Sequence, residues 1–169
     1  MPASRSDAAR DGTTIELPSD REILFTRTFD APARLVFEAL TRPEHVRQWW
    51  APRSRGELLR CEIDCRVGGT WRLVMRASNG FEVGFSGTYL EVEAPTRLVQ
   101  TEVFDPFPEA GAVVTVELVE RGGRTTLTSR ARYPSKAVRD QVLATGMEDG
   151  ARESYRQLTE LVVTLAGAA

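Results

Sequence analysis

Apolar and polar residues alternate along several segments between residues 21 and 133, which is the pattern of half-buried β-strands. Residues 21–29, REILFTRTF, begin this region and are rich in β-branched and aromatic side chains. Asn79-Gly80 and Gly122-Gly123 tolerate positive φ angles and therefore favour tight hairpins. The sequence predicts an antiparallel meander, with further strands at residues 56–64, 68–77, 81–93, 96–104, 112–120 and 124–133 and a Pro-rich loop at 105–111.

Spacings of three and four residues predict the helices. A short helix over residues 33–40 follows Asp30-Ala31-Pro32, which can cap and open it. Thr41 and Glu44 match a capping box for a second helix that ends at Trp49, and Ser135 can cap a third over residues 136–144. The longest helix is indicated by one face that carries Met147, Ala151, Ser154, Leu158, Leu161 and Leu165.

This order of elements predicts an α+β fold. A sheet must cover its apolar face, and only the C-terminal helix is long enough to do so. We expect a bent antiparallel sheet of about six or seven strands around that helix, with two short helices after the first strand. Residues 1–20 have almost nothing to bury and are interpreted as a flexible N-terminal tail, so that residues 21–169 form a single domain.

The C-terminal helix changes from small to large side chains along one face. Its first half carries Gly150, Ala151 and Ser154, whereas leucines follow in its second half. Glycine costs a helix interior about 1 kcal/mol relative to alanine, so Gly150 indicates a requirement for close packing or for space. Two outcomes fit this pattern: the helix lies close against the sheet, or it stands off and leaves a cavity.

The predicted strands offer walls for such a cavity. Large side chains share one face of two neighbouring strands: Trp71, Leu73, Met75, Phe85 and Tyr89. If the same alternation continued, Glu91 and Glu93 would also face inwards. A β-bulge near Gly87 would correct this, because glycine is the usual residue at such a position.

Charge and hydropathy exclude several classes of partner. The chain has 169 residues, a net charge of −2 and no cluster of Lys or Arg, so neither nucleic acid nor an anionic membrane is an expected partner. Its N-terminus has no apolar stretch typical of a secretion signal, and no segment is long and apolar enough for a membrane span. We expect a cytoplasmic protein without membrane insertion; homodimerisation is compatible with this composition.

No nucleophile–base motif, phosphate-binding loop or dinucleotide fingerprint is present. Cys61 and Cys65 would lie roughly 13 Å apart on an extended segment and are read as reduced thiols. With His45 as the only histidine, no metal site and no cofactor are predicted. His45 lies in the first turn of a predicted short helix, and we expect it to be a solvated surface residue.

Glu102 is the candidate for acid–base chemistry. It shares the strand phase of Leu98 and Gln100 and could face the cavity, where burial would raise its pKa and suit it to proton transfer. The other reading is a carboxylate that faces solvent or pairs with an arginine such as Arg130. The tandem tryptophans point about 100° apart on a helix, so Trp49 is expected to anchor the core and Trp50 to reach the pocket rim.

Several separated segments occur in one order between about residues 21 and 165: FDAPARLVFEALTRPEHVRQWWAP, CRVGGTWRLVMR, GTYLEVEAPTRLVQTE, TTLTSRARYPS and GMEDGARESYRQLTELV. Together they resemble the SRPBCC or START-like superfamily, in the branch named for the activator of heat-shock protein 90 ATPase homologue. This resemblance implies a helix-grip, birch-pollen-allergen-like fold with a deep, largely apolar pocket between sheet and C-terminal helix. The branch often has a large aromatic residue after the glycine matching Gly150, and Ala151 at that place implies a wider pocket.

The favoured hypothesis is a binding module for a small hydrophobic or aromatic molecule. Its predicted ligand-binding residues are Trp50, Trp71, Leu73, Met75, Phe85, Tyr89, Glu102, Met147, Gly150, Ala151 and Ser154. The alternative is an enzyme like a polyketide cyclase or aromatase, with Glu102 as the candidate proton-transfer residue. A weaker alternative is a chaperone-associated protein-interaction domain, which would need an exposed apolar patch.

Overall fold

The structure is a computed structural model that describes residues 12–168. Its strands are β1 (Thr14–Glu16), β2 (Glu22–Phe29), β3 (Gly56–Ile63), β4 (Thr70–Ala77), β5 (Glu82–Glu93), β6 (Arg97–Phe104), β7 (Phe107–Arg121) and β8 (Arg124–Arg132). Its helices are α1 (Ala33–Thr41), α2 (Pro43–Trp49), α3 (Lys136–Ala144) and α4 (Met147–Ala168).

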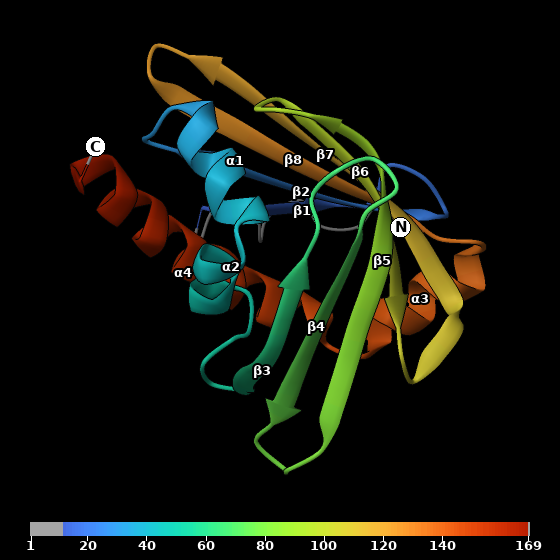
Figure 1. Ribbon diagram of the computed structural model, residues 1–169. Helices are drawn as coiled ribbons and strands as arrows, with labels where there is room; N and C mark the ends of the chain where they lie inside the picture. The colour runs from blue at the N-terminus through green and yellow to red at the C-terminus, as the bar shows by residue number, and fades with distance from the viewer. Residues whose placement is uncertain (1–11, 169) are drawn as a thin grey trace.

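All eight strands form one antiparallel sheet in the order β1-β2-β8-β7-β6-β5-β4-β3. Figure 1 shows that the sheet is strongly bent and that the long helix α4 runs across its concave side. The predicted helix-grip fold is therefore confirmed, with eight strands in place of the six or seven expected. Within the described residues, none of the helices is long and apolar enough to cross a membrane.

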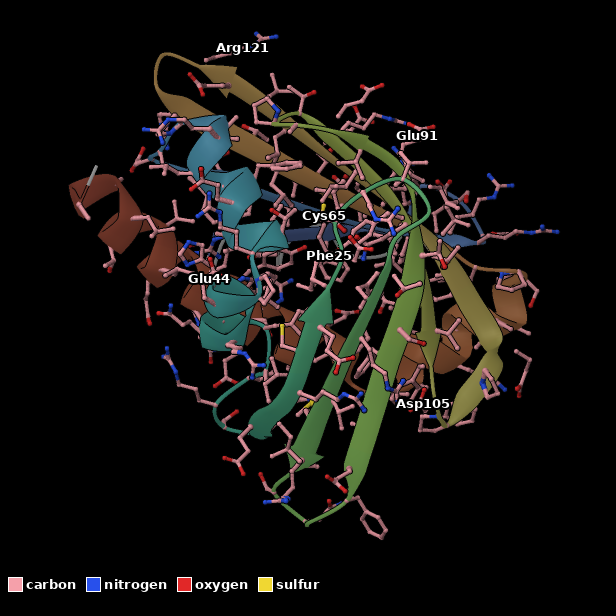
Figure 2. All side chains as sticks on the ribbon, viewed as in Figure 1. Phe25, Glu44, Cys65, Glu91, Asp105 and Arg121 are labelled. Atoms are coloured by element: carbon pink, nitrogen blue, oxygen red, sulfur yellow. The ribbon has the colours of Figure 1, made fainter. Side chains whose placement is uncertain are left out.

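The core lies between the sheet, α1 and the C-terminal half of α4. Leu158 and Val162 on α4 are almost completely buried, and so are Phe29 at the end of β2 and Val36 on α1. Figure 2 shows Phe25 inside the bent sheet, whereas charged residues such as Glu91 and Arg121 project from its rim. The large residues in the second half of α4 thus fill the core, as their spacing predicts.

The second helix does not begin as the sequence suggested. Thr41 belongs to the last turn of α1, and its hydroxyl donates a hydrogen bond to the Phe37 carbonyl at 2.8 Å. It therefore cannot cap α2, whose N-cap is Arg42 without any side-chain cap. The predicted capping box is wrong, whereas the cap of α3 is confirmed, because the Ser135 hydroxyl accepts from the Val138 N–H at 3.2 Å.

Part of the expected N-terminal tail belongs to the sheet. Residues 1–11 lie outside the described residues, but β1 pairs with β2 and places Ile15 opposite Phe25. Thr13, just before β1, is fully buried, and its hydroxyl accepts a hydrogen bond from the Arg27 guanidinium at 2.7 Å. A polar segment is held here by backbone pairing and an arginine contact, which hydrophobic patterning does not detect.

The predicted loop at residues 105–111 is also wrong for most of its length. Only Asp105 and Pro106 form the turn, and β7 starts at Phe107, opposite Phe104 of β6. Phe104 pairs with Phe107 and Glu102 pairs with Ala112, so the register of this hairpin shifts between these two pairs. Pro108 lies on β7 within the irregular stretch, where proline is tolerated because no regular backbone pairing is lost. The extended hairpin reaches towards α3, as Figure 1 shows.

Strand β5 contains the β-bulge that its sequence requires, but three residues after Gly87, the predicted position. The register with β6 shifts between Tyr89 and Glu91, which leaves Tyr89 buried and turns Glu91 outwards. Gly87 has a different role. A Cβ atom at Gly87 would overlap the Thr101 carbonyl oxygen of β6, so glycine is needed there for close approach of two backbones.

Candidate functional site

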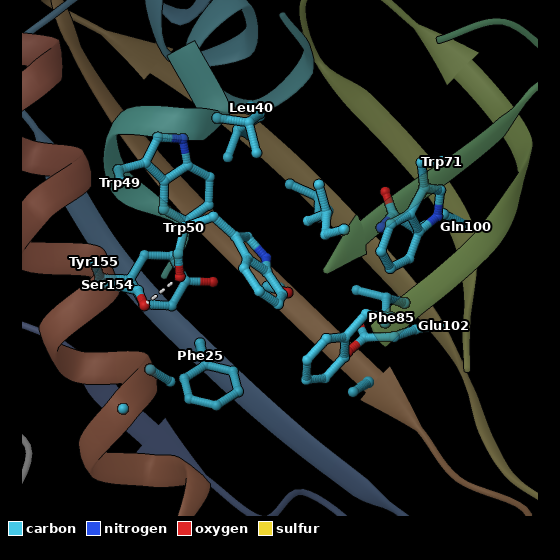
Figure 3. Close-up of a pocket in the computed structure, with 18 of the residues that line it drawn as sticks. Phe25, Leu40, Trp49, Trp50, Trp71, Phe85, Gln100, Glu102, Ser154 and Tyr155 are labelled. Atoms are coloured by element: carbon cyan, nitrogen blue, oxygen red, sulfur yellow. Dashed lines mark hydrogen bonds between the residues drawn. The ribbon is translucent and has the colours of Figure 1, made fainter. Parts of the chain in front are cut away.

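A cavity of about 370 Å³ lies between the concave face of the sheet and the N-terminal half of α4 (Figure 3). The structure brings all eleven predicted ligand-binding residues into its lining: Trp50, Trp71, Leu73, Met75, Phe85, Tyr89, Glu102, Met147, Gly150, Ala151 and Ser154. Their side chains come from β4, β5, β6, α4 and the end of α2. Whether these residues bind a ligand stays a prediction, but they surround one space.

Of the two outcomes left open for the small residues of α4, the second is observed: this half of the helix stands off from the sheet and leaves a cavity. Gly150 is buried against the segment after α2, because a Cβ atom there would lie 3.3 Å from the Arg55 guanidinium and 3.6 Å from Pro52. Ala151 borders the cavity. The helix therefore approaches a loop, not the sheet, and the space over the sheet stays open.

Ser154 lines the cavity and also holds its wall in place. Its hydroxyl donates a hydrogen bond to the Trp50 carbonyl at 2.7 Å. Glu153, one residue earlier, accepts from both the backbone N–H and the hydroxyl of Ser54. These contacts fasten the segment that carries Trp50 to α4, so Ser154 shapes the cavity wall.

Gln157 completes this attachment and was not among the predicted residues. Only 4% of its surface is exposed. Its amide nitrogen donates to the carbonyls of Trp49 and Ala51, both at 2.9 Å, and its amide oxygen accepts from the Arg53 N–H at 3.0 Å. One side chain thus satisfies three backbone groups in the segment between α2 and β3.

The tandem tryptophans divide their roles as expected. Trp49 is 8% exposed, and its indole N–H donates to the Ala39 carbonyl at 2.8 Å, which fixes α2 to α1. Trp50 points into the cavity and meets the Phe85 ring edge-on, with a centroid distance of 4.9 Å (Figure 3). Trp49 also lines the cavity, and its ring stacks on Tyr155 with a centroid distance of 6.5 Å.

Glu102 lies in the cavity wall together with Leu98 and Gln100, the residues whose strand phase it shares. Arg130, the partner considered for it, pairs instead with Glu22 at 2.9 Å. Among residues 12–168 the Glu102 carboxyl has no ion pair or hydrogen bond, and burial raises its pKa to about 7. Glu102 is therefore a carboxyl group that is partly protonated at neutral pH and faces an apolar space.

Tyrosines supply further polar atoms that pattern analysis overlooked. Tyr133 and Tyr155 both line the cavity, and burial raises the pKa of each, to about 12 for Tyr155. Ser129 is another polar lining residue. The signal for Ser129 and Tyr133 was present, because both share one face of β8 with the buried Leu127.

The remaining candidates lie elsewhere. His45 does not line the cavity; it is half-buried on α2, and its Nδ1 atom has no hydrogen-bond partner among the described residues. Cys61 and Cys65 are free thiols, and burial raises the pKa of both. No group of three or more His, Cys, Asp or Glu side chains in the described part of the chain is arranged to hold a metal ion.

The site can therefore enclose an apolar molecule and offer it a small number of polar contacts. Aromatic rings form much of the wall, and the unpaired carboxyl group of Glu102 can donate a hydrogen bond when protonated or accept one when ionised. A nucleophile beside a base is not found among the lining residues.

Comparison with known proteins agrees with the fold. A crystal structure from Rhodobacter sphaeroides is 28% identical, with a TM-score of 0.83 and coverage of 90% of this chain and 99% of that one. One from Nitrosomonas europaea is 26% identical, with a TM-score of 0.78 and coverage of 88% and 97%. An Hsp90 activator from Plasmodium falciparum shares the fold over 66% of this chain and 72% of its own, at 22% identity and a TM-score of 0.50.

No curated protein matches the chain. The family described as activator of Hsp90 ATPase homolog 1-like protein matches residues 30–163, which include the helices α1, α2 and α3, the six strands β3 to β8 and most of α4. The protein therefore belongs to the activator of Hsp90 ATPase homolog 1-like family, within the SRPBCC superfamily.

Proposed function

We propose that this protein binds a small hydrophobic or aromatic molecule in the cavity between its sheet and α4. The observation that supports this most strongly is the cavity itself, whose volume of about 370 Å³ is lined mainly by apolar and aromatic side chains. Binding sites for small molecules have this size and character, with few polar groups that orient the ligand.

Two features of the wall favour an aromatic ligand. The edge-on pair of Trp50 and Phe85 places two aromatic rings in the cavity wall, and aromatic rings prefer offset or edge-to-face neighbours. Glu102, on the strand paired with that of Phe85, supplies a polar group in the same wall. Because its pKa is raised to about 7, its protonated form can donate a hydrogen bond to a carbonyl or hydroxyl oxygen of the ligand.

Replacing Ala151 with Trp should block this site without unfolding the protein. An indole at this position would project into the cavity, where Ala151 leaves space, so little repacking is needed. For a fluorescent dimethylaminonaphthalene that carries an acetyl ketone, here called the acetyl probe, we expect at least a tenfold weaker affinity by titration, or about 1.4 kcal/mol.

The matched control is Val163→Trp, which places the same side chain on the exposed face of α4, where Val163 is 58% exposed. This variant should bind the acetyl probe like the wild type. If Ala151→Trp bound the probe as tightly as the control does, the cavity would not be the binding site. If it lost several kcal/mol of stability, Ala151 would be part of a packed core and would not border an open cavity.

An enzyme like a polyketide cyclase or aromatase is the second candidate, and the position of Glu102 favours it. A carboxyl group with a pKa of about 7 that faces an apolar cavity is suited to proton transfer near neutral pH. The variant Glu102→Gln separates the two functions. An enzyme loses turnover but keeps ligand affinity, whereas a carrier has no turnover to lose.

Glu102 should also make the stability of the protein depend on pH. Its pKa is raised in the folded state, so the folded chain holds this proton more tightly than the unfolded chain, and stability falls as the pH rises from about 4.5 to about 7. Glu102→Gln removes this loss. In urea unfolding, we expect the variant to match the wild type at about pH 4 and to be more stable by about 3 kcal/mol at about pH 8. A stability difference that does not change with pH would show that the carboxyl group is solvated.

A further inference from the structure

A second cavity, of about 390 Å³, adjoins the first on the side of α3. We call the cavity at α4 the inner chamber and this one the outer chamber. The outer chamber is enclosed by the β6–β7 hairpin, α3 and the start of α4, and its lining comprises Phe85, Glu102, Phe104, Phe107, Ala110, Ala112, Tyr133, Gln141, Val142, Ala144, Thr145 and Met147. Four of these residues also line the inner chamber: Phe85, Glu102, Tyr133 and Met147.

A series of aromatic rings runs through both chambers. Trp50 of the inner chamber contacts Phe85 at a centroid distance of 4.9 Å, and Phe85 contacts Phe104 at 4.9 Å. Phe104 in turn lies 6.0 Å from Phe107, whose surface is 48% exposed. The rings thus form one continuous apolar wall from the inner chamber to the protein surface.

The polar residues of the outer chamber lie in two places. Gln141 and Thr145 are exposed on α3 and at its C-terminal end, so they belong to the rim. Glu102 and Tyr133 lie where the two chambers meet. Between these places the lining is formed by alanine, valine and phenylalanine side chains, which can contact an apolar chain but cannot orient a polar one.

We propose that the two chambers form one site for an elongated ligand, with a compact aromatic head in the inner chamber, a flexible apolar arm in the outer chamber and a hydrogen-bonding oxygen between them at Glu102. This inference rests on the proposed binding function and deepens it, because it defines the shape of the ligand. A head group that fits the inner chamber alone leaves an apolar space of similar volume unfilled. An arm that enters this space buries further apolar surface.

The test compares the acetyl probe with an octanoyl probe, which has the same dimethylaminonaphthalene head and ketone but a longer alkyl arm. Burying two methylene groups strengthens binding by roughly tenfold, so the wild type should bind the octanoyl probe at least tenfold more tightly. The variant Ala144→Trp fills the outer chamber from an exposed position on α3 and should remove this advantage while the acetyl probe binds as before. Ala137→Trp, on the exposed face of the same helix and outside both linings, is the matched control and should change neither affinity.

The outcomes separate this inference from the function on which it rests. If the acetyl probe binds but the longer arm gains nothing, or if the gain survives in Ala144→Trp, the outer chamber is not part of the site and the proposed function stands. If the wild type binds neither probe, the proposed function fails and the inference fails with it. A tenfold gain that Ala144→Trp abolishes and Ala137→Trp preserves supports the two-chamber site.

Discussion

Replacing Gly87 with Ala is expected to cost the protein about 4 kcal/mol or more of its free energy of unfolding, enough to unfold a marginally stable domain. The added Cβ atom would overlap the Thr101 carbonyl oxygen and would lie 2.6 Å from the Trp71 indole nitrogen. Thr101 belongs to the paired strand β6, so its backbone cannot move away without breaking the pairing of β5 with β6. Urea unfolding followed by circular dichroism measures this effect.

Gly111→Ala is the matched control, because Gly111 also lies in a strand but a Cβ atom there would have no neighbour closer than 3.7 Å. This variant should be as stable as the wild type or slightly more stable, since alanine has less conformational freedom than glycine in the unfolded chain. Equal unfolding midpoints for the two variants would contradict the close approach of β5 and β6, and with it the geometry of the wall that carries Trp71.

Gln157→Leu should destabilise the protein by about 3 to 5 kcal/mol, because a leucine of similar size keeps water out and leaves three backbone groups without their partner. The groups affected are the carbonyls of Trp49 and Ala51 and the N–H of Arg53. Since this segment carries Trp50, the variant should also bind the acetyl probe more weakly under conditions in which it remains folded. Thermal and urea unfolding provide the measurement.

Gln48→Leu serves as the control for this substitution. Gln48 is exposed on α2, and its amide donates a single hydrogen bond to the Glu44 carbonyl at 3.1 Å. Water can replace that partner, so a change of less than about 0.5 kcal/mol is expected. If Gln157→Leu were equally mild, the attachment of α4 to the segment after α2 would not depend on Gln157.

The fold followed from local periodicity in the sequence, whereas the cavity was one of two outcomes that periodicity left open and was implied by the family resemblance. Strand alternation placed Trp71, Phe85 and Glu102 on the concave face, and the change from small to large residues along α4 placed Ala151 at the cavity. These signals are short-range, since each concerns residues of one strand or one helix. The same alternation also required a bulge in β5, but it did not predict that the bulge would follow Tyr89.

Contacts between distant segments were not predictable in this way. Gln157 counts as a polar helix residue in any periodicity analysis, and its partners lie more than a hundred residues earlier in the chain. Thr41 matched a capping pattern, but the preceding helix continued to include it. The outer chamber was not predicted, because Pro106 and Pro108 indicated a loop where β7 in fact begins. Without this strand, the sequence pattern did not predict a hairpin that packs near α3 and leaves an apolar space there.

The most direct test of the central claim is a crystal structure of the wild-type protein with the acetyl probe. We expect electron density for the naphthalene ring in the inner chamber, between Trp50 and Ala151, with the ketone oxygen directed at Glu102. Density for the probe on the outer surface only, with the inner chamber unchanged, would contradict the claim that this cavity is the binding site.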